Sequence, residues 1–388
     1  MSARQRRNKN IVILLLVFLL FISMTTEIKV YAQETENLAG LYIESQICSQ
    51  NIIKYAKENV YRFILAEMVE KNIKYSNLPV LGSPFALINE EEDTVIYYFP
   101  ILYNDHIEAT FRVYEVNGQL AGIYSKALAN ELEKLSKKTT AKKPAVVTVN
   151  NGNIIAVTYE GIDILQKDPY GRNINKDKLK NFRKISVQSS DNEVINCKTP
   201  IPYLSEVDTS KITVNNTLPR FKYLNTKIHE TQSSYPWCAA YVTAFIVNFR
   251  TGRTDIRARD VVKFAHPNSN NIYQETVSRS QCIAFAKKYG LNPYQPSSNI
   301  SYSTAKRQIA AGKPIYMSCD KISGDKKKES DDKQASHALA LRGYNEQTSI
   351  FSVWNPWYNY YETMPIDSRI YVAANGSRWE WKRSIIDW

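Results

Sequence analysis

Cys238 is the residue of this sequence whose type and surroundings best suit covalent chemistry. It opens an apolar stretch, residues 238–248, that predicts a helix of about three turns buried on most sides. Because unpaired N–H groups and the helix dipole favour an anion in a first turn, a cysteine there can act as a thiolate nucleophile. Gln232 lies six positions upstream on the approach loop, where its amide could turn toward the sulfur. A buried structural cysteine is the alternative interpretation of this stretch alone.

His337 and Asn355 offer the other groups that a thiol nucleophile needs, a base and a residue that holds the base in one tautomer. His337 begins an alternating pattern that predicts a strand over residues 337–344, and Asn355 ends a second predicted strand, residues 350–354. These strand ends could meet the helix of Cys238 across a cleft. Trp357 could roof the hydrogen bond between the asparagine and the histidine and keep water away from it.

The other three histidines are weaker candidates for the base. His266 ends a predicted helix, where it can cap carbonyl groups. We expect His229 to be exposed and His106 to lie in a surface loop. His337 is therefore the favoured base, because it opens a strand ahead of the strand that Asn355 ends.

The order Gln232, Cys238, His337 and Asn355-x-Trp357 resembles that of papain-like cysteine proteases. The local sequence is similar to that of the staphopain subfamily of secreted bacterial peptidases, in continuous order over residues 215–388. The motifs that carry this resemblance are the stretch from Glu230-Thr231-Gln232 to Trp237-Cys238-Ala239, taken as one motif, then Phe264-Ala265-His266-Pro267-Asn268, His337-Ala338-Leu339-Ala340 and Trp354-Asn355-Pro356-Trp357. Four separate motifs in the correct order form a strong signal, although any one of them alone is weak.

The resemblance implies an endopeptidase made as a zymogen, in which Cys238 attacks the peptide bond and His337 transfers the protons. Asn355 would orient the histidine ring, and Gln232 would receive the oxyanion together with the backbone N–H of the cysteine. Trp237 and Trp357 would support these groups. The resemblance also implies protein substrates outside the cell and a small dedicated protein inhibitor made by the producing cell.

Residues 215–388 predict an α+β domain, with helices first and an antiparallel sheet afterwards. This order is that of the two-lobed papain-like plan, in which a helical lobe and a β-barrel-like lobe enclose a cleft. Capping residues, glycines and apolar patterns place the expected elements. The helices are expected at 256–265 (capped by Thr254-Asp255), 278–289 and 303–311, and the strands at 315–319, 337–344, 350–354 and 369–372.

Residues 33–214 predict a separate mixed α/β, strand-rich domain without a catalytic constellation. The pattern favours a helix at 49–71, strands at 94–99 and 108–116, a helix at 126–135 and a hairpin at 146–158, with turns at Asn117-Gly118 and Asn151-Gly152. Such a domain ahead of a protease-like one suggests a propeptide that occupies the cleft. Residues 168–220, rich in polar side chains, would be its cleavable connector, with the mature start near Asn215. A permanently attached binding domain is the alternative.

Basic residues before the apolar run 11–22 and the small-x-small pattern ending at Ala32 predict a secretory signal peptide, residues 1–32. An uncleaved membrane anchor is the alternative, but the run is short for a span. We therefore expect an extracellular protein with no stable membrane span after processing. The net charge of +12 suggests attraction to anionic surfaces such as cell-wall polymers, whereas no nucleic-acid-binding motif is found.

The five cysteines are few and widely spaced, and their number is odd, so at least one has no partner within the chain. Cys282 and Cys319 are expected to be small core residues, although a disulfide between them is possible. No spacing of cysteines and histidines fits a zinc site, so we predict neither a metal nor a cofactor.

Two other functions compete with the protease. A peptidoglycan amidase or endopeptidase also uses cysteine followed by histidine and would suit a secreted cationic protein, but it gives no reason for Gln232 or for Asn355-x-Trp357. A secreted binding protein without activity would leave the four ordered motifs as a coincidence.

Overall fold

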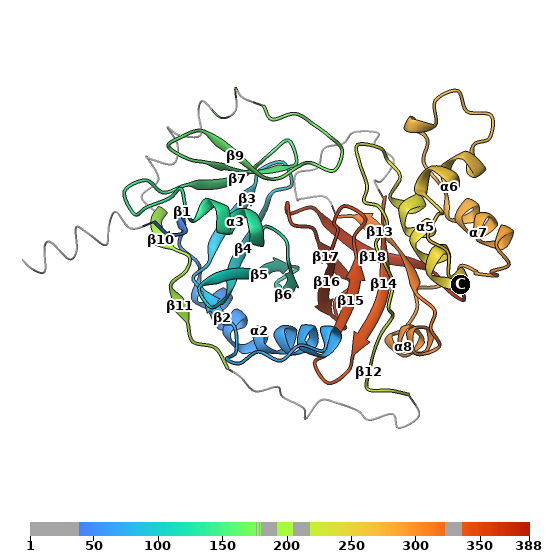
Figure 1. The fold of residues 1–388 in the computed structure, drawn as a ribbon, viewed down its shortest axis with the longest axis horizontal. Helices are drawn as coiled ribbons and strands as arrows, with labels where there is room; N and C mark the ends of the chain where they lie inside the picture. The colour runs from blue at the N-terminus through green and yellow to red at the C-terminus, as the bar shows by residue number, and fades with distance from the viewer. Residues whose placement is uncertain (1–38, 176, 178, 180–191, 205–217, 323–335) are drawn as a thin grey trace, which may run out of the picture.

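The computed structural model describes residues 39–175, 177, 179, 192–204, 218–322 and 336–388. The predicted signal peptide and the predicted processing point near Asn215 lie outside these residues. Within them the protein has a mixed α/β fold with strand-rich sheets (Figure 1). No helix in this part of the chain is both long enough and apolar enough to cross a membrane.

The N-terminal part consists mainly of strands, with a 22-residue helix packed against two of them (Figure 1). Its elements are β1 (Tyr42–Gln46), α2 (Gln50–Lys71), β2 (Val80–Gly82), β3 (Phe85–Asn89), β4 (Thr94–Tyr103), β5 (His106–Val116), β6 (Gln119–Ser125), α3 (Ala129–Leu135), β7 (Val146–Asn150), β8 (Asn153–Val157), β9 (Ile162–Gln166), β10 (Asn192–Asn196) and β11 (Pro200–Ile201). Helix α2 begins where the Ser49 side chain accepts a hydrogen bond from the N–H of Ile52, and its apolar face lies on β5 and β6. The predicted helices and strands of this part are therefore confirmed.

Both predicted Asn-Gly turns close hairpins. Asn117 and Gly118 have φ values of 53° and 75° between β5 and β6, and Asn151 and Gly152 have φ values of 46° and 73° between β7 and β8. Two successive residues with positive φ form the type of turn whose twist matches that of the paired strands. The local sequence was thus sufficient to predict these two hairpins.

The C-terminal part opens with a short strand, β12, that was not predicted, and then has helices followed by strands, as predicted. Its elements are β12 (Phe221–Tyr223), α5 (Cys238–Thr251), α6 (Ala258–Ala265), the 3-10 helix η1 (Ile272–Gln274), α7 (Arg279–Lys288), α8 (Tyr302–Ala310), β13 (Ile315–Lys321), β14 (Ser336–Asn345), β15 (Ile350–Trp354), β16 (Tyr361–Pro365), β17 (Ile370–Val372) and β18 (Arg378–Ile385). The predicted start of α6 was wrong, because its capping residue is not the Thr254-Asp255 pair. The Asp255 carboxylate pairs with Arg253, and Asp260 accepts the hydrogen bond from the N–H of Arg257.

The strands of the two parts join in one extended sheet. Its order is β17-β18-β13-β14-β15-β16-β6-β5-β4-β3-β7-β8-β9, and the junction between the parts is the pairing of Thr363 in β16 with Tyr124 in β6. Strands β17 and β16 stand at opposite ends of the row of C-terminal strands, yet Tyr371 of β17 donates a hydrogen bond to Glu362 of β16. The C-terminal strands therefore curl, so that the two ends of the row meet. Helices α5, α6 and α7 lie together beside this curled sheet (Figure 1).

Buried ion pairs also connect the two parts. Arg112 of β5 pairs with Glu362 of β16 at 2.8 Å, and neither side chain is exposed to solvent. Arg342 of β14 pairs with Glu70 near the end of α2. A buried charge left without its partner is strongly destabilising, so these contacts make the packing of each part depend on the other.

All five cysteines are free thiols in this structure. Cys282 and Cys319 are fully buried in two different apolar clusters, so the prediction of small core residues is confirmed and the disulfide between them does not form.

Candidate active site

Cys238 is the first residue of α5, and its side chain is half-buried. Trp237 precedes it and accepts the hydrogen bond from the N–H of Tyr241, which starts the helix. Burial raises the pKa of the Cys238 thiol, while the backbone N–H groups of Ala338, Ala239 and Cys238 itself act on the sulfur in the opposite direction. The contact with Ala338 brings the sulfur beside β14, one residue from His337.

His337 lies near the start of β14 and is 2% exposed. Its Nε2 lies 3.0 Å from Oδ1 of Asn355, the residue that follows β15. Because an amide oxygen can only accept, Nε2 must carry the proton, and the lone pair of the ring is on Nδ1. Nδ1 is buried and has no hydrogen-bond partner. The structure therefore leaves the basic nitrogen of His337 available to another group.

Two indole rings enclose the imidazole of His337. The ring centroids of Trp357 and Trp379 lie 4.3 Å and 5.0 Å from that of His337. The backbone N–H of Trp357 also donates to Oδ1 of Asn355 at 3.1 Å, so Trp357 lies against the hydrogen bond that it was expected to cover. Burial lowers the pKa of His337 to about 4, and the hydrogen bond with Asn355 acts in the opposite direction. The imidazole is therefore neutral near pH 7 in this structure.

Gln232 connects the loop before α5 to the turn after Asn355. Its backbone N–H donates to the carbonyl of Pro356 at 2.7 Å, and its side-chain Nε2 donates to the carbonyl of Tyr235 at 2.8 Å. Its Oε1 is buried without a hydrogen-bond partner. The hydrogen bond from Nε2 to Tyr235 thus fixes the Gln232 side-chain amide within its own loop.

Trp237 is 4% exposed and helps to fix the start of α5. Its ring stacks on Tyr273 at 5.8 Å and packs against Tyr235 at 4.9 Å, and its indole N–H donates to the carbonyl of Ile272. Trp237 is therefore a packing residue behind Cys238.

The other histidines lie elsewhere, and His229 is half-buried, so the expectation that it is exposed was wrong. Nε2 of His266 lies 2.7 Å from the carbonyl oxygen of Thr276, and His106 is exposed beside Glu133. Within the described ranges, no three histidine, cysteine, aspartate or glutamate side chains group closely enough to hold a metal ion.

Residues of the N-terminal part that were predicted to belong to the connector lie against this site. Tyr170 packs edge-on against Trp357 with ring centroids 5.9 Å apart. Desolvation, and next the charge of Cys238, raise the pKa of the Tyr170 phenol, which shows that it lies near the sulfur. Gly171 has a φ of +71° and approaches Ser234 so closely that a Cβ there would collide with the serine Oγ. Tyr170 and Gly171 therefore contact residues of the candidate site, whereas a cleavable connector was predicted to begin at residue 168.

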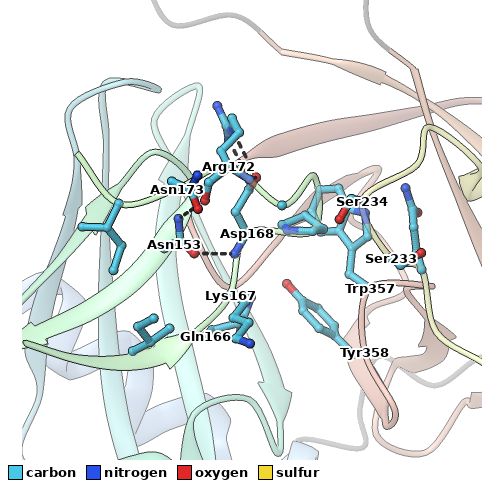
Figure 2. Close-up of a pocket in the computed structure, with 15 residues that line it drawn as sticks. Asn153, Gln166, Lys167, Asp168, Arg172, Asn173, Ser233, Ser234, Trp357 and Tyr358 are labelled. Atoms are coloured by element: carbon cyan, nitrogen blue, oxygen red, sulfur yellow. Dashed lines mark hydrogen bonds and ion pairs between the residues drawn. The ribbon is translucent and has the colours of Figure 1, made fainter. Parts of the chain in front are cut away.

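Side-chain hydrogen bonds hold this segment in shape. The Asp168 carboxylate accepts from the backbone N–H of Arg172 at 2.9 Å and pairs with its guanidinium at 3.0 Å. The N–H of Asp168 donates to Oδ1 of Asn153 at 2.9 Å. Figure 2 shows these contacts on one side of a cavity of about 870 Å³, with Ser233, Ser234 and Trp357 on the other. The cavity is thus lined by both parts of the chain.

Residues 215–388 match a family described as staphopain peptidase C47. Staphopain A of Staphylococcus aureus (strain MRSA252) is 24% identical over 320 residues, which cover 79% of this chain and 79% of that protein. An extracellular cysteine protease of Staphylococcus epidermidis is 28% identical over 166 residues, which cover 42% of this chain and 92% of that protein.

Proposed function

We propose that this chain, whose residues 215–388 resemble staphopain peptidases, cleaves proteins through Cys238, His337 and Asn355. The observation that carries this proposal is the state of the His337 ring. Nε2 is held by Asn355 at 3.0 Å, and Nδ1 is buried without a partner beside the helix that begins with Cys238. This is the arrangement that a cysteine nucleophile needs from its base.

In the proposed reaction, Nδ1 of His337 takes the thiol proton and the Cys238 sulfur forms a bond to the carbonyl carbon of the substrate. The imidazolium then gives its proton to the leaving amine as the C–N bond breaks, which leaves an acyl-enzyme. The same nitrogen next takes a proton from water, whose oxygen attacks the acyl carbon and releases the thiol. Asn355 keeps the ring in the Nε2–H tautomer throughout.

The oxyanion that forms during these steps would be stabilised by the side-chain amide of Gln232 and the backbone N–H of Cys238. We expect Gln232→Ala to lower kcat by about 100-fold to 1,000-fold with a small change in KM, because oxyanion donors act on the transition state. The measurement is steady-state hydrolysis of a fluorogenic peptide by the processed enzyme. Gln274→Ala, an exposed residue of η1, is the matched control. Unchanged kcat in Gln232→Ala would remove Gln232 from the site.

We assign residues 215–388 to the catalytic domain, with the two-lobed papain-like architecture. Helices α5, α6 and α7 would form the helical lobe, and β13 to β18 the barrel-like lobe. Cys238 starts a helix of the first lobe and His337 begins a strand of the second, so the reacting groups would meet between the lobes. The curl of the sheet that joins Tyr371 to Glu362 supports the barrel-like assignment.

We assign residues 1–32 to a signal peptide cleaved after about Ala32 and residues 33–214 to a propeptide, so that the full chain is a secreted zymogen. The propeptide would keep the enzyme inactive by holding residues 168–173 over the site. The contacts of Tyr170 with Trp357 and of Gly171 with Ser234 support this role. The word "extracellular" in the name of the Staphylococcus epidermidis relative supports secretion.

An active-site titrant separates this function from its rivals. We expect an epoxysuccinyl peptide to label Cys238 only after limited proteolysis has removed the N-terminal part, and we expect casein hydrolysis to appear at the same time. Peptide mapping by mass spectrometry locates the label. Clearing of cell walls without casein cleavage would instead identify an amidase. A processed protein that is neither labelled nor active would be a binding protein.

A further inference from the structure

A continuous line of buried polar side chains leads from the proposed catalytic histidine into the N-terminal part. His337 bonds to Asn355 at 3.0 Å, and Nδ2 of Asn355 donates to the hydroxyl oxygen of Tyr371 at 2.9 Å. The Tyr371 hydroxyl donates to one oxygen of Glu362. The other oxygen of Glu362 accepts from Arg112 at 2.8 Å. The line therefore starts at the base and ends on β5.

Each hydrogen bond between Asn355, Tyr371 and Glu362 has only one possible donor. An ionised carboxylate has no proton to give, so Glu362 must accept from the Tyr371 hydroxyl. The hydroxyl oxygen of Tyr371 is then left to accept, and only the NH₂ group of Asn355 can donate to it. The amide is thereby oriented with its oxygen toward Nε2 of His337. Burial also raises the pKa of the Tyr371 phenol, which keeps this hydroxyl protonated.

The orientation of the Asn355 amide determines which ring nitrogen of His337 carries the proton. If the amide turned over, its NH₂ group would face Nε2, and the proton would move to Nδ1. Nδ1 could then no longer accept the thiol proton. The backbone N–H of Trp357 also favours this orientation of the Asn355 amide, because it donates to Oδ1 at 3.1 Å. Tyr371 is thus one of two groups that hold the amide.

The charge of Glu362 is compensated from outside the proposed catalytic domain. Glu362 and Arg112 are both 0% exposed, and Arg112 also donates to the carbonyl of Val372, the residue after Tyr371. The phenols of Tyr98 and Tyr358 lie near this ion pair, and burial raises the pKa of both, so they stay neutral. Removing one member of a buried ion pair leaves an uncompensated buried charge and is strongly destabilising. Arg112 is therefore the cation on which this carboxylate depends in the full chain.

We propose that Tyr371 and Glu362 are positioning residues that fix the tautomer of His337, and that Arg112 completes their network before processing. This inference rests on the proposed roles of His337 and Asn355. Residues of β16, β17 and the N-terminal β5 thus act through Asn355, without contact with a substrate.

The test is the tautomer of His337 in the full chain, measured by NMR of protein with ¹⁵N-labelled histidine. Four histidines give few signals, and His337→Gln assigns the one of interest. We expect the wild type to show the Nε2–H form at pH 7. In Tyr371→Phe we expect a mixture with the Nδ1–H form. Tyr344→Phe is the matched control, because it removes a buried hydroxyl that donates to Pro219, remote from Asn355.

Two further changes keep the test decisive if Tyr371→Phe does not fold. Glu362→Asp retains the charge near Arg112 but withdraws the acceptor from the Tyr371 hydroxyl, so it should also give the mixture. Arg112→Lys keeps the counter-charge and should retain the wild-type tautomer, whereas Arg112→Met should not. A wild-type tautomer in both Tyr371→Phe and Glu362→Asp would overturn the proposal.

Kinetics of the processed enzyme separate this proposal from the proposed function. We expect Tyr371→Phe to lower kcat by about tenfold and to leave KM within about twofold, since one of two anchors of the amide is lost, and we expect Tyr344→Phe to match the wild type. An unchanged kcat in Tyr371→Phe would overturn a positioning role in catalysis. If wild-type protein never hydrolyses a peptide but the tautomers change as described, the proposed function fails and the structural network stands.

Discussion

Cys238→Ala is expected to abolish peptide hydrolysis by the processed enzyme, with a loss in kcat of about a million-fold. The reason is that no other described group can form the acyl-enzyme at this position, and removal of a nucleophile costs about this much in hydrolases with a similar triad. The fold should persist, because the Cys238 side chain is half-buried at a helix start and alanine is a good helix former. The measurement is kcat on a peptide substrate, with circular dichroism as the check on folding.

Cys282→Ala and Cys319→Ala are the matched controls for this change. Both thiols are fully buried, unpaired and remote from solvent, and burial raises the pKa of Cys282 to about 12. Their removal should cost stability through a small cavity but leave kcat within a few-fold of the wild type. Residual activity of Cys238→Ala near that of these controls would mean that the nucleophile lies elsewhere in the chain.

The sequence was sufficient to predict the parts of the site that depend on local patterns. The apolar stretch after Cys238 does form the helix α5, and the alternation after His337 does form β14. Asn355 follows β15 as expected, and the strand pairing of β14 with β15 brings it to the histidine. These residues could be found because each one stands at the end of an element that its own neighbours specify.

Strand β16 could not be predicted, and Glu362 was missed with it. Four of its five residues are buried, so the alternation of polar and apolar side chains that indicates a strand is absent. From the sequence alone, Glu362 would be expected at the surface, because its ion-pair partner Arg112 is 250 positions away. A buried ion pair between such distant residues leaves no local signal in a single sequence.

The stretch after Asp168, which contacts the candidate site, was wrongly predicted as a connector for a related reason. Polar residues after Asp168 suggested an open connector, but two of them fold the segment on itself through the contact between Asp168 and Arg172. Asn153, in the preceding hairpin, anchors it from outside. Composition measures the tendency of a stretch to be solvated, and it does not report such specific hydrogen bonds.

The reactivity of Cys238 toward iodoacetamide is expected to depend steeply on pH before processing and to become nearly independent of pH afterwards. In the full chain burial raises the pKa of the Cys238 thiol from its ordinary value and lowers that of His337 to about 4, so both groups are neutral near pH 6. Alkylation should then be slow and rise about tenfold for each unit of increasing pH, because only the thiolate reacts. After processing, solvent reaches the site and a thiolate–imidazolium pair can form. Alkylation at pH 6 should then be at least about 100-fold faster and nearly independent of pH.

Tyr170→Ala tests whether the covering segment causes this difference. The ring of Tyr170 packs on Trp357, and an aromatic contact of this kind contributes about 0.5–1.5 kcal/mol. Its loss should raise the alkylation rate of the full chain at pH 6 by up to about tenfold. Tyr159→Ala removes an exposed tyrosine of the same part and should have no effect. Mass spectrometry of the labelled peptides distinguishes Cys238 from the buried thiols, which serve as internal controls. If the full chain is alkylated at pH 6 as fast as the processed enzyme, the ion pair already exists in the full chain, and the proposed latency would have to arise from exclusion of substrate alone.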